Sequence, residues 1–315
     1  MKFKKYLCLC LALLLLAAAG CASKKEDKMK IGLLPNVESL PFYVASDKGY
    51  YQEEGINVEL ILFESAMERD SAVQAGEVDG VLGDILAVAS LNNSGTPVKI
   101  ASLALGASGK EGRFAILSSP ASDITRPEQL KNIPVSISTN SIIEYVTDNL
   151  LTEAGLKPNE IKKEAIPKIP VRFNLLIENK IQAACLPDPL AALAEKKGAK
   201  LVIDDTSSNL SQTVIYFRDQ YLDKNSKSVV RFFNAYARAA KDINDNPDAY
   251  NDLLIEKARV PKEALGVFTM DHYPAPQLPE REQVERVVKW MLAKDLIKTD
   301  YTYEDLIRTD LLPKP

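Results

Sequence analysis

Three short polar segments follow apolar, strand-like stretches, and each opens a stretch with helical spacing. They are Asn36–Phe42 in "LLPNVESLPF", Gly83–Asp84 in "VLGDIL" and Ser138–Ser141 in "SISTNSII". Backbone N–H groups at a helix N-terminus, helped by small polar side chains, suit carboxylate, sulfonate or polar heterocycle groups. The same residue types are ordinary N-caps, so capping alone explains any single one of these segments.

Two charged residues near other predicted strand ends are further candidates. Asp188 in "CLPDPLAAL" precedes Pro189, which fits an N-cap with proline at the first helical position. Its carboxylate could instead accept a hydrogen bond from a ligand N–H group. Arg113 follows the glycine-rich stretch "GASGKEG" and could either pair with an anion or stay solvated. Arg172 is expected on a helix surface.

Aromatic residues offer a second kind of contact. Phe42 and Tyr145 could stack on a planar ligand, although core packing is the better explanation for each. Tyr273 and His272 in "DHYPAP" could line the rim of a site or form a structural turn.

Residue counts narrow the chemistry. His272 is the only histidine, and Cys185 is the only cysteine beyond residue 21. A multi-histidine metal site, a cysteine-based metal site and an intrachain disulfide are therefore not expected. The chain has no G-x-S-x-G and no Walker A pattern. We expect no catalytic residue, metal or cofactor. The formal net charge of −4 argues against nucleic acid as a partner.

The elements that would position these residues alternate along the chain. Short apolar strand patterns and amphipathic helix patterns from Met29 to Leu105 predict a βαβαβαβ series, and a shorter series follows. The extended stretches Phe114–Ser118 and Thr213–Phe217 bracket the second series and could cross between two lobes. The alternative is one continuous α/β sheet. Beyond them the pattern is mostly helical.

The N-terminus has the pattern of a bacterial lipoprotein signal. The basic "MKFKK" precedes the apolar "YLCLCLALLLLAAAG", which is short for a membrane-spanning helix, and small residues precede Cys21. We expect a signal peptide over residues 1–20, acylation of Cys21 and a polar tether up to residue 28. The alternative is an ordinary secretory signal that is cleaved near Ala19 or Ala22.

One set of motifs resembles a known family. The segment "IGLLPNVESLPFYVASDKGYYQEEGINVEL" is similar to the N-terminal signature of the nitrate, sulfonate, taurine and thiamine-precursor (NMT1-like) solute-binding proteins of ABC transporters. The stretches "AVQAGEVDGVLGDILAV", "RPEQLKNIPVSIS", "LIENKIQAACLPDP" and "FFNAYARAAKDINDNPDAY" follow in the family's order. The resemblance covers nearly all of Met29–Leu312.

The resemblance implies a type II periplasmic-binding-protein fold, in which two α/β lobes are joined by two crossing strands with a ligand cleft between them. Residues 29–115 and 215–315 would form the first lobe, and residues 116–214 the second. The family's contact loops fall on three segments and Asp188, to which we add Arg113. The candidate ligand-binding residues are Asn36, Ser39, Leu40, Pro41, Phe42, Gly83, Asp84, Arg113, Ser138, Thr139, Asn140, Ser141 and Asp188.

The resemblance also implies partners and a location. The chain would be a monomer that is lipid-anchored at the extracytoplasmic face of a bacterial cell membrane, on the periplasmic or cell-surface side. It would capture a small heterocycle, organic acid or sulfonate and deliver it to an ABC permease driven by a cytoplasmic ATPase. The alternatives are an enzyme of the same fold that acts on a small metabolite, or a lipoprotein adhesin.

Overall fold

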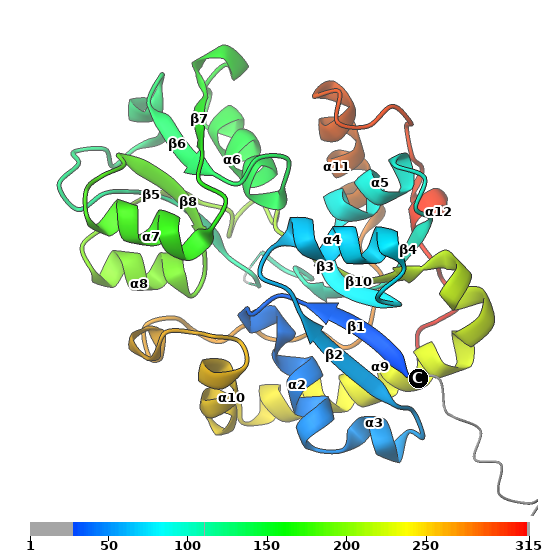
Figure 1. Cartoon of the computed structure of the whole chain (residues 1–315). Helices are drawn as coiled ribbons and strands as arrows, with labels where there is room; N and C mark the ends of the chain where they lie inside the picture. Colours follow the sequence, from blue (N-terminus) through cyan, green and yellow to red (C-terminus); the bar gives the residue numbers. More distant parts are fainter. Residues whose placement is uncertain (1–27, 110, 314–315) are drawn as a thin grey trace, which may run out of the picture.

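The chain forms two α/β lobes that lie side by side, each built on one five-stranded sheet (Figure 1). The computed structural model describes residues 28–109 and 111–313. The expected signal peptide, the lipidation site Cys21 and the tether up to residue 27 lie outside the described residues. None of the helices in the described part of the chain is long and apolar enough to cross a membrane.

The first lobe has a mixed sheet with the strand order β2-β1-β3-β10-β4. β1 pairs in parallel with β2 and β3, as the alternating pattern predicts, because helices return the chain between these strands. β10 comes from much later in the chain and runs antiparallel between β3 and β4, so the sheet is not wholly parallel. The strands are β1 (Met29–Leu33), β2 (Val58–Leu62), β3 (Gly80–Asp84), β4 (Val98–Leu105) and β10 (Thr213–Arg218).

The second lobe repeats this arrangement with the strand order β7-β6-β8-β5-β9. β6 pairs in parallel with β7 and β8, whereas β5 runs antiparallel between β8 and β9. Each lobe is therefore a parallel core completed by one antiparallel strand. The strands are β5 (Phe114–Ser118), β6 (Pro134–Ile137), β7 (Lys162–Ala165), β8 (Ala183–Pro187) and β9 (Lys200–Asp204).

Helices cover both faces of both sheets. In the first lobe α2, α3 and α9 lie on one face and α4, α5 and α11 on the other; in the second lobe α7 and α8 lie opposite α6 (Figure 1). The α-helices are α2 (Leu40–Asp47), α3 (Tyr50–Glu53), α4 (Ala66–Ala75), α5 (Ile85–Asn93), α6 (Ile142–Glu153), α7 (Ile169–Ile177), α8 (Leu190–Lys196), α9 (Asp219–Asp245), α10 (Asn251–Glu256), α11 (Arg281–Ala293) and α12 (Tyr303–Leu306). Short 3-10 helices are η1 (Val37–Ser39), η2 (Pro127–Leu130), η3 (Pro158–Glu160), η4 (Pro247–Tyr250) and η5 (Lys262–Ala264).

The long helix α9 supplies much of the core of the first lobe. Its buried residues Val229, Phe232, Tyr236, Ala239 and Ile243 recur every three or four positions, which places them on one face of the helix. Tyr236 packs edge-on against Phe42 of α2, with ring centroids 5.2 Å apart. This packing fixes α2, and with it the loop that precedes α2.

The chain passes between the lobes twice. β5 pairs along its length with β8 and β9, and β10 pairs with β3 and β4, so neither strand is shared between the sheets. The chain therefore changes lobe within residues 106–113 and again within 205–212. The expected lobe limits, 29–115 with 215–315 and 116–214, fall just inside these two strands, and we propose that the two passages are the boundary between the lobes.

Candidate functional site

The loop between β1 and α2 is held by its own polar residues. The Ser39 hydroxyl lies 2.7 Å from the Leu34 carbonyl oxygen and 3.0 Å from Asn36 Oδ1. Asn36 Nδ2 donates to Glu38 Oε2 at 3.1 Å. The candidates Asn36 and Ser39 thus shape the loop, and the carboxylate that they orient is Glu38.

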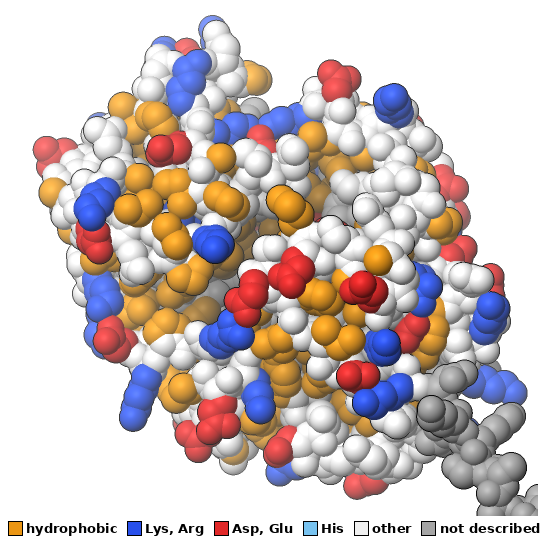
Figure 2. All heavy atoms as spheres, viewed as in Figure 1, with side chains coloured by type: hydrophobic (Ala, Val, Ile, Leu, Met, Phe, Trp, Pro, Cys, Tyr) orange, Lys and Arg blue, Asp and Glu red, His pale blue; other side chains and the backbone are white. Residues whose placement is uncertain are grey.

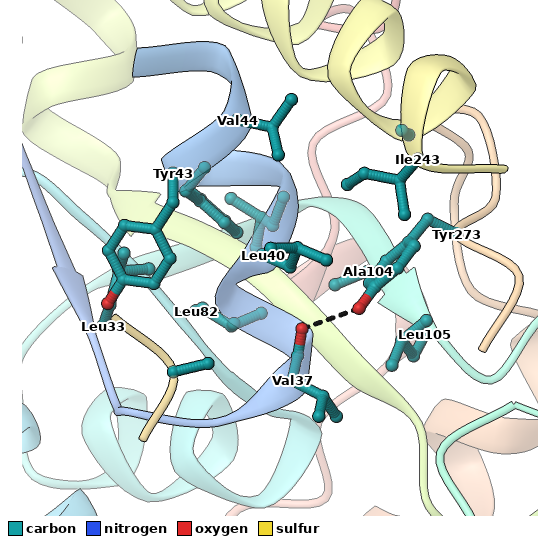
Figure 3. Close-up of a cluster of buried hydrophobic side chains, with 14 of the residues drawn as sticks. Leu33, Val37, Leu40, Tyr43, Val44, Leu82, Ala104, Leu105, Ile243 and Tyr273 are labelled. Carbon is teal, nitrogen blue, oxygen red and sulfur yellow. Dashed lines mark hydrogen bonds between the residues drawn. The ribbon is translucent and has the colours of Figure 1, made fainter. Parts of the chain in front are cut away.

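The next three candidates belong to the first turn of α2. Leu40 and Phe42 are fully buried in the hydrophobic core, and Pro41 is buried beside them. Figure 3 shows Leu40 among the packed side chains of this core. The structure places all three behind the loop, where they support it.

Asp84 ends β3 on the same side of the first lobe. Its Oδ1 accepts a hydrogen bond from Ala87 N at 2.8 Å, so it caps α5. Desolvation raises the Asp84 pKa, and the nearby charge of Arg69 opposes this effect. A Cβ atom at Gly83 would lie 3.0 Å from Cζ of Arg69, so glycine allows the buried guanidinium to approach the backbone here.

Four carboxylates from different segments act on one another. Desolvation raises the pKa of Glu38 to about 7, and the charges of Asp271 and Asp84 act in the same direction. Desolvation also raises the pKa of Asp271 to about 7, and Asp188 adds to the shift. We call Asp84, Glu38, Asp271 and Asp188 the carboxylate line. It begins in the first lobe and ends in the second.

Arg113 closes the second-lobe end of the carboxylate line. Its guanidinium lies 2.9 Å from Asp204, 2.8 Å from Glu195 and 3.4 Å from Asp188. Asp188 Oδ1 also accepts from Ala192 N at 3.0 Å, which satisfies an N–H group in the first turn of α8. The sequence left open whether Arg113 pairs with an anion or stays solvated; its three partners are carboxylates of the protein itself.

A cavity of about 480 Å³ opens at this point between the second lobe and the segment that follows α10. Figure 2 shows side chains of both charge signs along the junction of the lobes. A second hollow, lined by residues such as Ser119 and Gln182, lies at the amino ends of β6 and β8. Ligands of open α/β sheets bind outside the carboxyl ends of strands, so the first cavity is the candidate site. Its lining residues are Arg113, Asp188, Ala192, Glu195, Thr206, Val267, Phe268, Thr269 and Asp271.

The loop Ser138–Ser141 is anchored separately. Ser141 caps α6 by accepting from Ile143 N at 3.3 Å, and the Ser138 hydroxyl donates to Pro167 O at 3.0 Å. Thr139 and Asn140 are exposed, and Asn140 has a left-handed φ of 53°. These candidates lie at the carboxyl end of β6, but their described contacts are within the second lobe.

The expectation that Arg172 lies on a helix surface is wrong, because the side chain is fully buried. It donates to Cys185 O at 2.9 Å, to Ile166 O at 2.6 Å and to Ser138 Oγ at 3.2 Å. Burial lowers the Arg172 pKa to about 10. Arg172 therefore holds the ends of three neighbouring strands of the second sheet together.

The other aromatic candidates are structural. Tyr145 is buried and packs edge-on against Trp290, with ring centroids 5.4 Å apart. The Tyr273 hydroxyl donates to Val37 O at 2.7 Å, which is the dashed contact in Figure 3. Tyr273 thereby ties the segment that carries Asp271 to the loop that carries Glu38. His272 is exposed beside it.

The one described cysteine is not set up as a nucleophile. Cys185 is fully buried, and burial raises its pKa to about 11, so the thiol stays protonated at neutral pH. Among residues 28–109 and 111–313, no group of three or more His, Cys, Asp or Glu side chains could hold a metal ion.

The candidates named from the sequence omit Glu38 and Asp271. Glu38 lies inside the Asn36–Phe42 segment, and a carboxylate directly after a buried strand was a usable signal. Asp271 adjoins the "HYPAP" turn, but nothing local brings that turn to Glu38.

Comparison with known proteins identifies the family. A sequence model of the NMT1/THI5-like family matches residues 36–250, which is more than half of the chain of 315 residues. The chain belongs to the NMT1/THI5-like family. No curated protein sequence matches it significantly.

Solved structures show the fold of this NMT1/THI5-like protein. The alkanesulfonate-binding protein SsuA from Xanthomonas axonopodis pv. citri, bound to MOPS, has a TM-score of 0.75 at 15% identity and covers 90% of this chain and 98% of its own. The aliphatic sulphonate-binding SsuA from Escherichia coli has a TM-score of 0.75 at 17% identity, with coverages of 90% and 98%. The nitrate-binding NrtA from Synechocystis PCC 6803 has a TM-score of 0.71 at 13% identity, with coverages of 91% and 87%. The predicted periplasmic-binding-protein fold is confirmed.

Proposed function

We propose that this protein is the substrate-binding subunit of an ABC importer and captures a small polar organic solute between its lobes. The observation that carries the proposal is the cavity of about 480 Å³, which is lined by Asp188 of the second lobe and by Asp271, the neighbour of Glu38 in the carboxylate line. Family membership and the likeness to SsuA and NrtA, which bind sulfonates and nitrate, support it. At these identities the likeness does not carry over a particular substrate.

The two passages between the lobes would serve as hinges. A solute that contacts Glu38 and Asp84 on one side and Asp188 on the other would favour the closed arrangement, because only that arrangement offers all of the contacts at once. The closed protein would then deliver the solute to the permease. No covalent step is required of any residue.

An enzyme of the same fold is the second candidate, and the buried thiol argues against a cysteine-dependent version. A raised Cys185 pKa leaves little thiolate at neutral pH, and thiolate is the reactive form. An adhesin would not need buried carboxylates from separate segments next to a cavity, because burying them costs stability.

Native mass spectrometry tests the proposed function. The chain from Lys24 onward contains every described helix and strand and is the form to use. We expect a small molecule to be retained at one per chain, and to be released unchanged on denaturation. Steady chemical conversion of the retained molecule would instead place the protein among enzymes. Failure to retain or bind any small molecule would favour the adhesin.

The proposed lipid anchor has its own test at Cys21. Replacing the acylated thiol, as in Cys21→Ser, should abolish metabolic labelling of the full-length chain with a fatty acid. It should also move the protein from the membrane fraction to the soluble fraction or stall it with its leader attached, because one signal for anchoring is lost. Cys185→Ser is the matched control and should keep full labelling. Undiminished labelling of Cys21→Ser would exclude this residue as the anchor.

A further inference from the structure

We propose that the solute held by this site is a small organic cation that presents N–H donors, and that Glu38 and Asp271 are the carboxylates that receive it. This inference rests on the proposed function and names the chemical class of its substrate. It separates this protein from the sulfonate-binding and nitrate-binding proteins that share its fold.

The first argument is the balance of charge. The described cations next to the carboxylate line are Arg69 and Arg113. Arg69 donates to Leu82 O at 2.9 Å and pairs with Asp70 at 2.8 Å, and Arg113 is shared among three carboxylates. Glu38 and Asp271 make no ion pair among the described contacts. Lys110 lies outside the described residues and is not counted.

The partners that Glu38 and Asp271 do have are neutral. Glu38 accepts from Asn36 Nδ2 at 3.1 Å, and Asp271 accepts from Gly112 N at 3.1 Å. A partly buried carboxylate that lacks a countercharge destabilises the empty protein. A cationic solute would remove that cost when it binds, whereas an anionic solute would increase it.

The second argument is independent of charge and comes from buried polar oxygens without partners. The Tyr236 side chain is fully buried, and its hydroxyl has no hydrogen-bond partner among the described residues. Desolvation raises the Tyr236 pKa, and the charges of Glu38 and Glu111 add to the shift. The hydroxyls of Tyr43, Tyr51 and Tyr145 are also buried without a partner in the described part of the chain, so the Tyr236 hydroxyl supports the inference only as an oxygen that an N–H group of a solute would satisfy.

Two more oxygens of this kind lie on the same side of the lobe. Thr213, whose buried hydroxyl has no described partner, is the register partner of Asp84 across β10 and β3, so both side chains lie on one face of the sheet. The Gln212 amide oxygen is also buried without a partner, next to Gly106. These two hydroxyls and one amide oxygen can accept from the N–H donors of a solute, although Arg69 Nη2 and Arg286 Nε are also buried without a described hydrogen-bond partner.

The lack of a convergent group of oxygens in the described part of the chain favours an organic cation over a metal ion. A single metal ion requires several oxygens that converge to within 2.0–2.6 Å of one point. The carboxylate line instead runs from Asp84 to Asp188, and its members influence one another without gathering into a metal-binding group within the described part of the chain. The separated N–H groups of an organic molecule can reach such spaced oxygens.

A matched panel of ions tests the inference on the chain from Lys24 onward. The cations are agmatine, putrescine and 4-aminopyridine; the anions are butanesulfonate, nitrate and pyridine-4-carboxylate; calcium and zinc chlorides complete the set. Thermal shift at pH 8 ranks them, and calorimetry measures the affinity of those that bind. We expect at least one organic cation to raise the melting temperature and no anion to do so.

Variants then assign the binding to the site. Glu38→Gln and Asp271→Asn should each lower the affinity for the cation by about tenfold or more, because each removes one charged hydrogen-bond partner. Glu256→Gln, an exposed carboxylate on α10, is the control and should bind like the unchanged protein. Equal affinity in all four proteins would overturn the assignment to Glu38 and Asp271.

The remaining outcomes separate this inference from the proposed function. Binding of an anion but of no cation, or of metal salts alone, would overturn the inference and leave a solute-binding protein standing. If no compound of the panel bound, the inference would also be overturned. If native mass spectrometry still found a retained small molecule, the proposed function would survive, and if it found none, both would fall.

Discussion

At the scale of single residues, Glu38 and Asp271 are the carboxyl groups whose burial most destabilises the empty site. Both carboxyl groups have pKa values raised to about 7, chiefly because burial disfavours their charged forms. Around Glu38 stand the like charges of Asp271 and Asp84, opposed by Asn36 and Arg69. A site that binds a cation is expected to be destabilised by its own buried carboxylates as long as no cation is bound.

This destabilisation predicts how the stability of the empty protein depends on pH. The folded pKa of Glu38 lies above its ordinary value of 4.5, so the folded state keeps a proton that the unfolded state has lost. The free energy of unfolding should therefore fall as pH rises from about 5 to 8, by roughly 1–3 kcal/mol for this group. Urea unfolding at pH 5 and pH 8 measures the change.

Replacement of the carboxyl group isolates this effect. Glu38→Gln should be more stable than the unchanged protein at pH 8. Its free energy of unfolding should fall less between pH 5 and pH 8, and the fall that remains is due to Asp271. Exposed Glu256→Gln should keep the full fall. If the free energies of unfolding of Glu38→Gln and Glu256→Gln depend on pH in the same way, the Glu38 carboxyl is not the group that destabilises the empty protein at high pH.

The sequence predicted the location of the first contact loop better than the role of its members. Polar residues directly after a buried strand indicated Asn36–Phe42, but the hydrogen bonds of Asn36 and Ser39 turn inward to the loop itself. Arg172 was misplaced because its amphipathic helix shows only spacing. Its acceptors, Ile166 O and Cys185 O, come from other strands, and that meeting depends on tertiary packing.

At the scale of elements, α11 links the lobes opposite the long helix α9. Its pattern in "PEREQVERVVKWMLAKDLI" predicted the helix, which packs on α5 of the first lobe. Its far end reaches α6 of the second lobe, where Lys294 Nζ lies 2.6 Å from both Glu144 and Asp148 and Trp290 meets Tyr145. Helical spacing predicts a buried face but not which lobe covers it, so this bridge could not be predicted.

The bridge gives a prediction for Lys294→Met. Burial disfavours the charged Glu144 carboxyl, but its hydrogen bonds to Lys163 and Lys294 hold its pKa at about 2. Loss of Lys294 should lower the free energy of unfolding by about 1–3 kcal/mol at pH 7. Because Glu144 must be ionised to contribute, the deficit should shrink as pH falls from about 4.5 towards 2.

Urea unfolding at pH 7 and pH 3 checks both parts of this prediction. Lys289→Met, at an exposed position on the same helix, is the matched control and should change stability little. A deficit of the same size at both pH values would mean that Lys294 acts through its ammonium group, which lies 4.7 Å from the centroid of the Trp290 ring, and not through the ion pairs.

At the scale of the whole molecule, packing holds the two lobes together, whereas like charges at the cavity repel one another. One buried core runs from β1, α2 and α9 to the α7 and α8 face of the second lobe, and the other joins α5 and α11 to α6. These cores and the Lys294 bridge draw the lobes together. Charge acts in the opposite sense where Asp188 of the second lobe and Asp271 both line the cavity, because the charge of Asp188 adds to the raised pKa of Asp271.

This opposition predicts a more compact molecule when the line is neutralised. The double variant Glu38→Gln/Asp271→Asn removes two of the four carboxylates without altering α11, and the side-chain oxygen that remains at position 271 can still accept from Gly112 N in the first passage. At pH 8 and an ionic strength of about 0.02 M, charges across the cavity are weakly screened, because the Debye length exceeds 10 Å. Small-angle X-ray scattering should then give a smaller radius of gyration for the double variant than for the unchanged protein.

Salt provides the internal control. At about 0.5 M ionic strength the Debye length falls to a few ångströms, so the repulsion is screened in the unchanged protein and the two radii should converge. Glu256→Gln should follow the unchanged protein at both salt concentrations. Identical radii at low salt would show that packing alone sets the distance between the lobes. The affinity for a cationic solute would then come from local contacts at Glu38 and Asp271, and relief of repulsion between the lobes would contribute nothing to it.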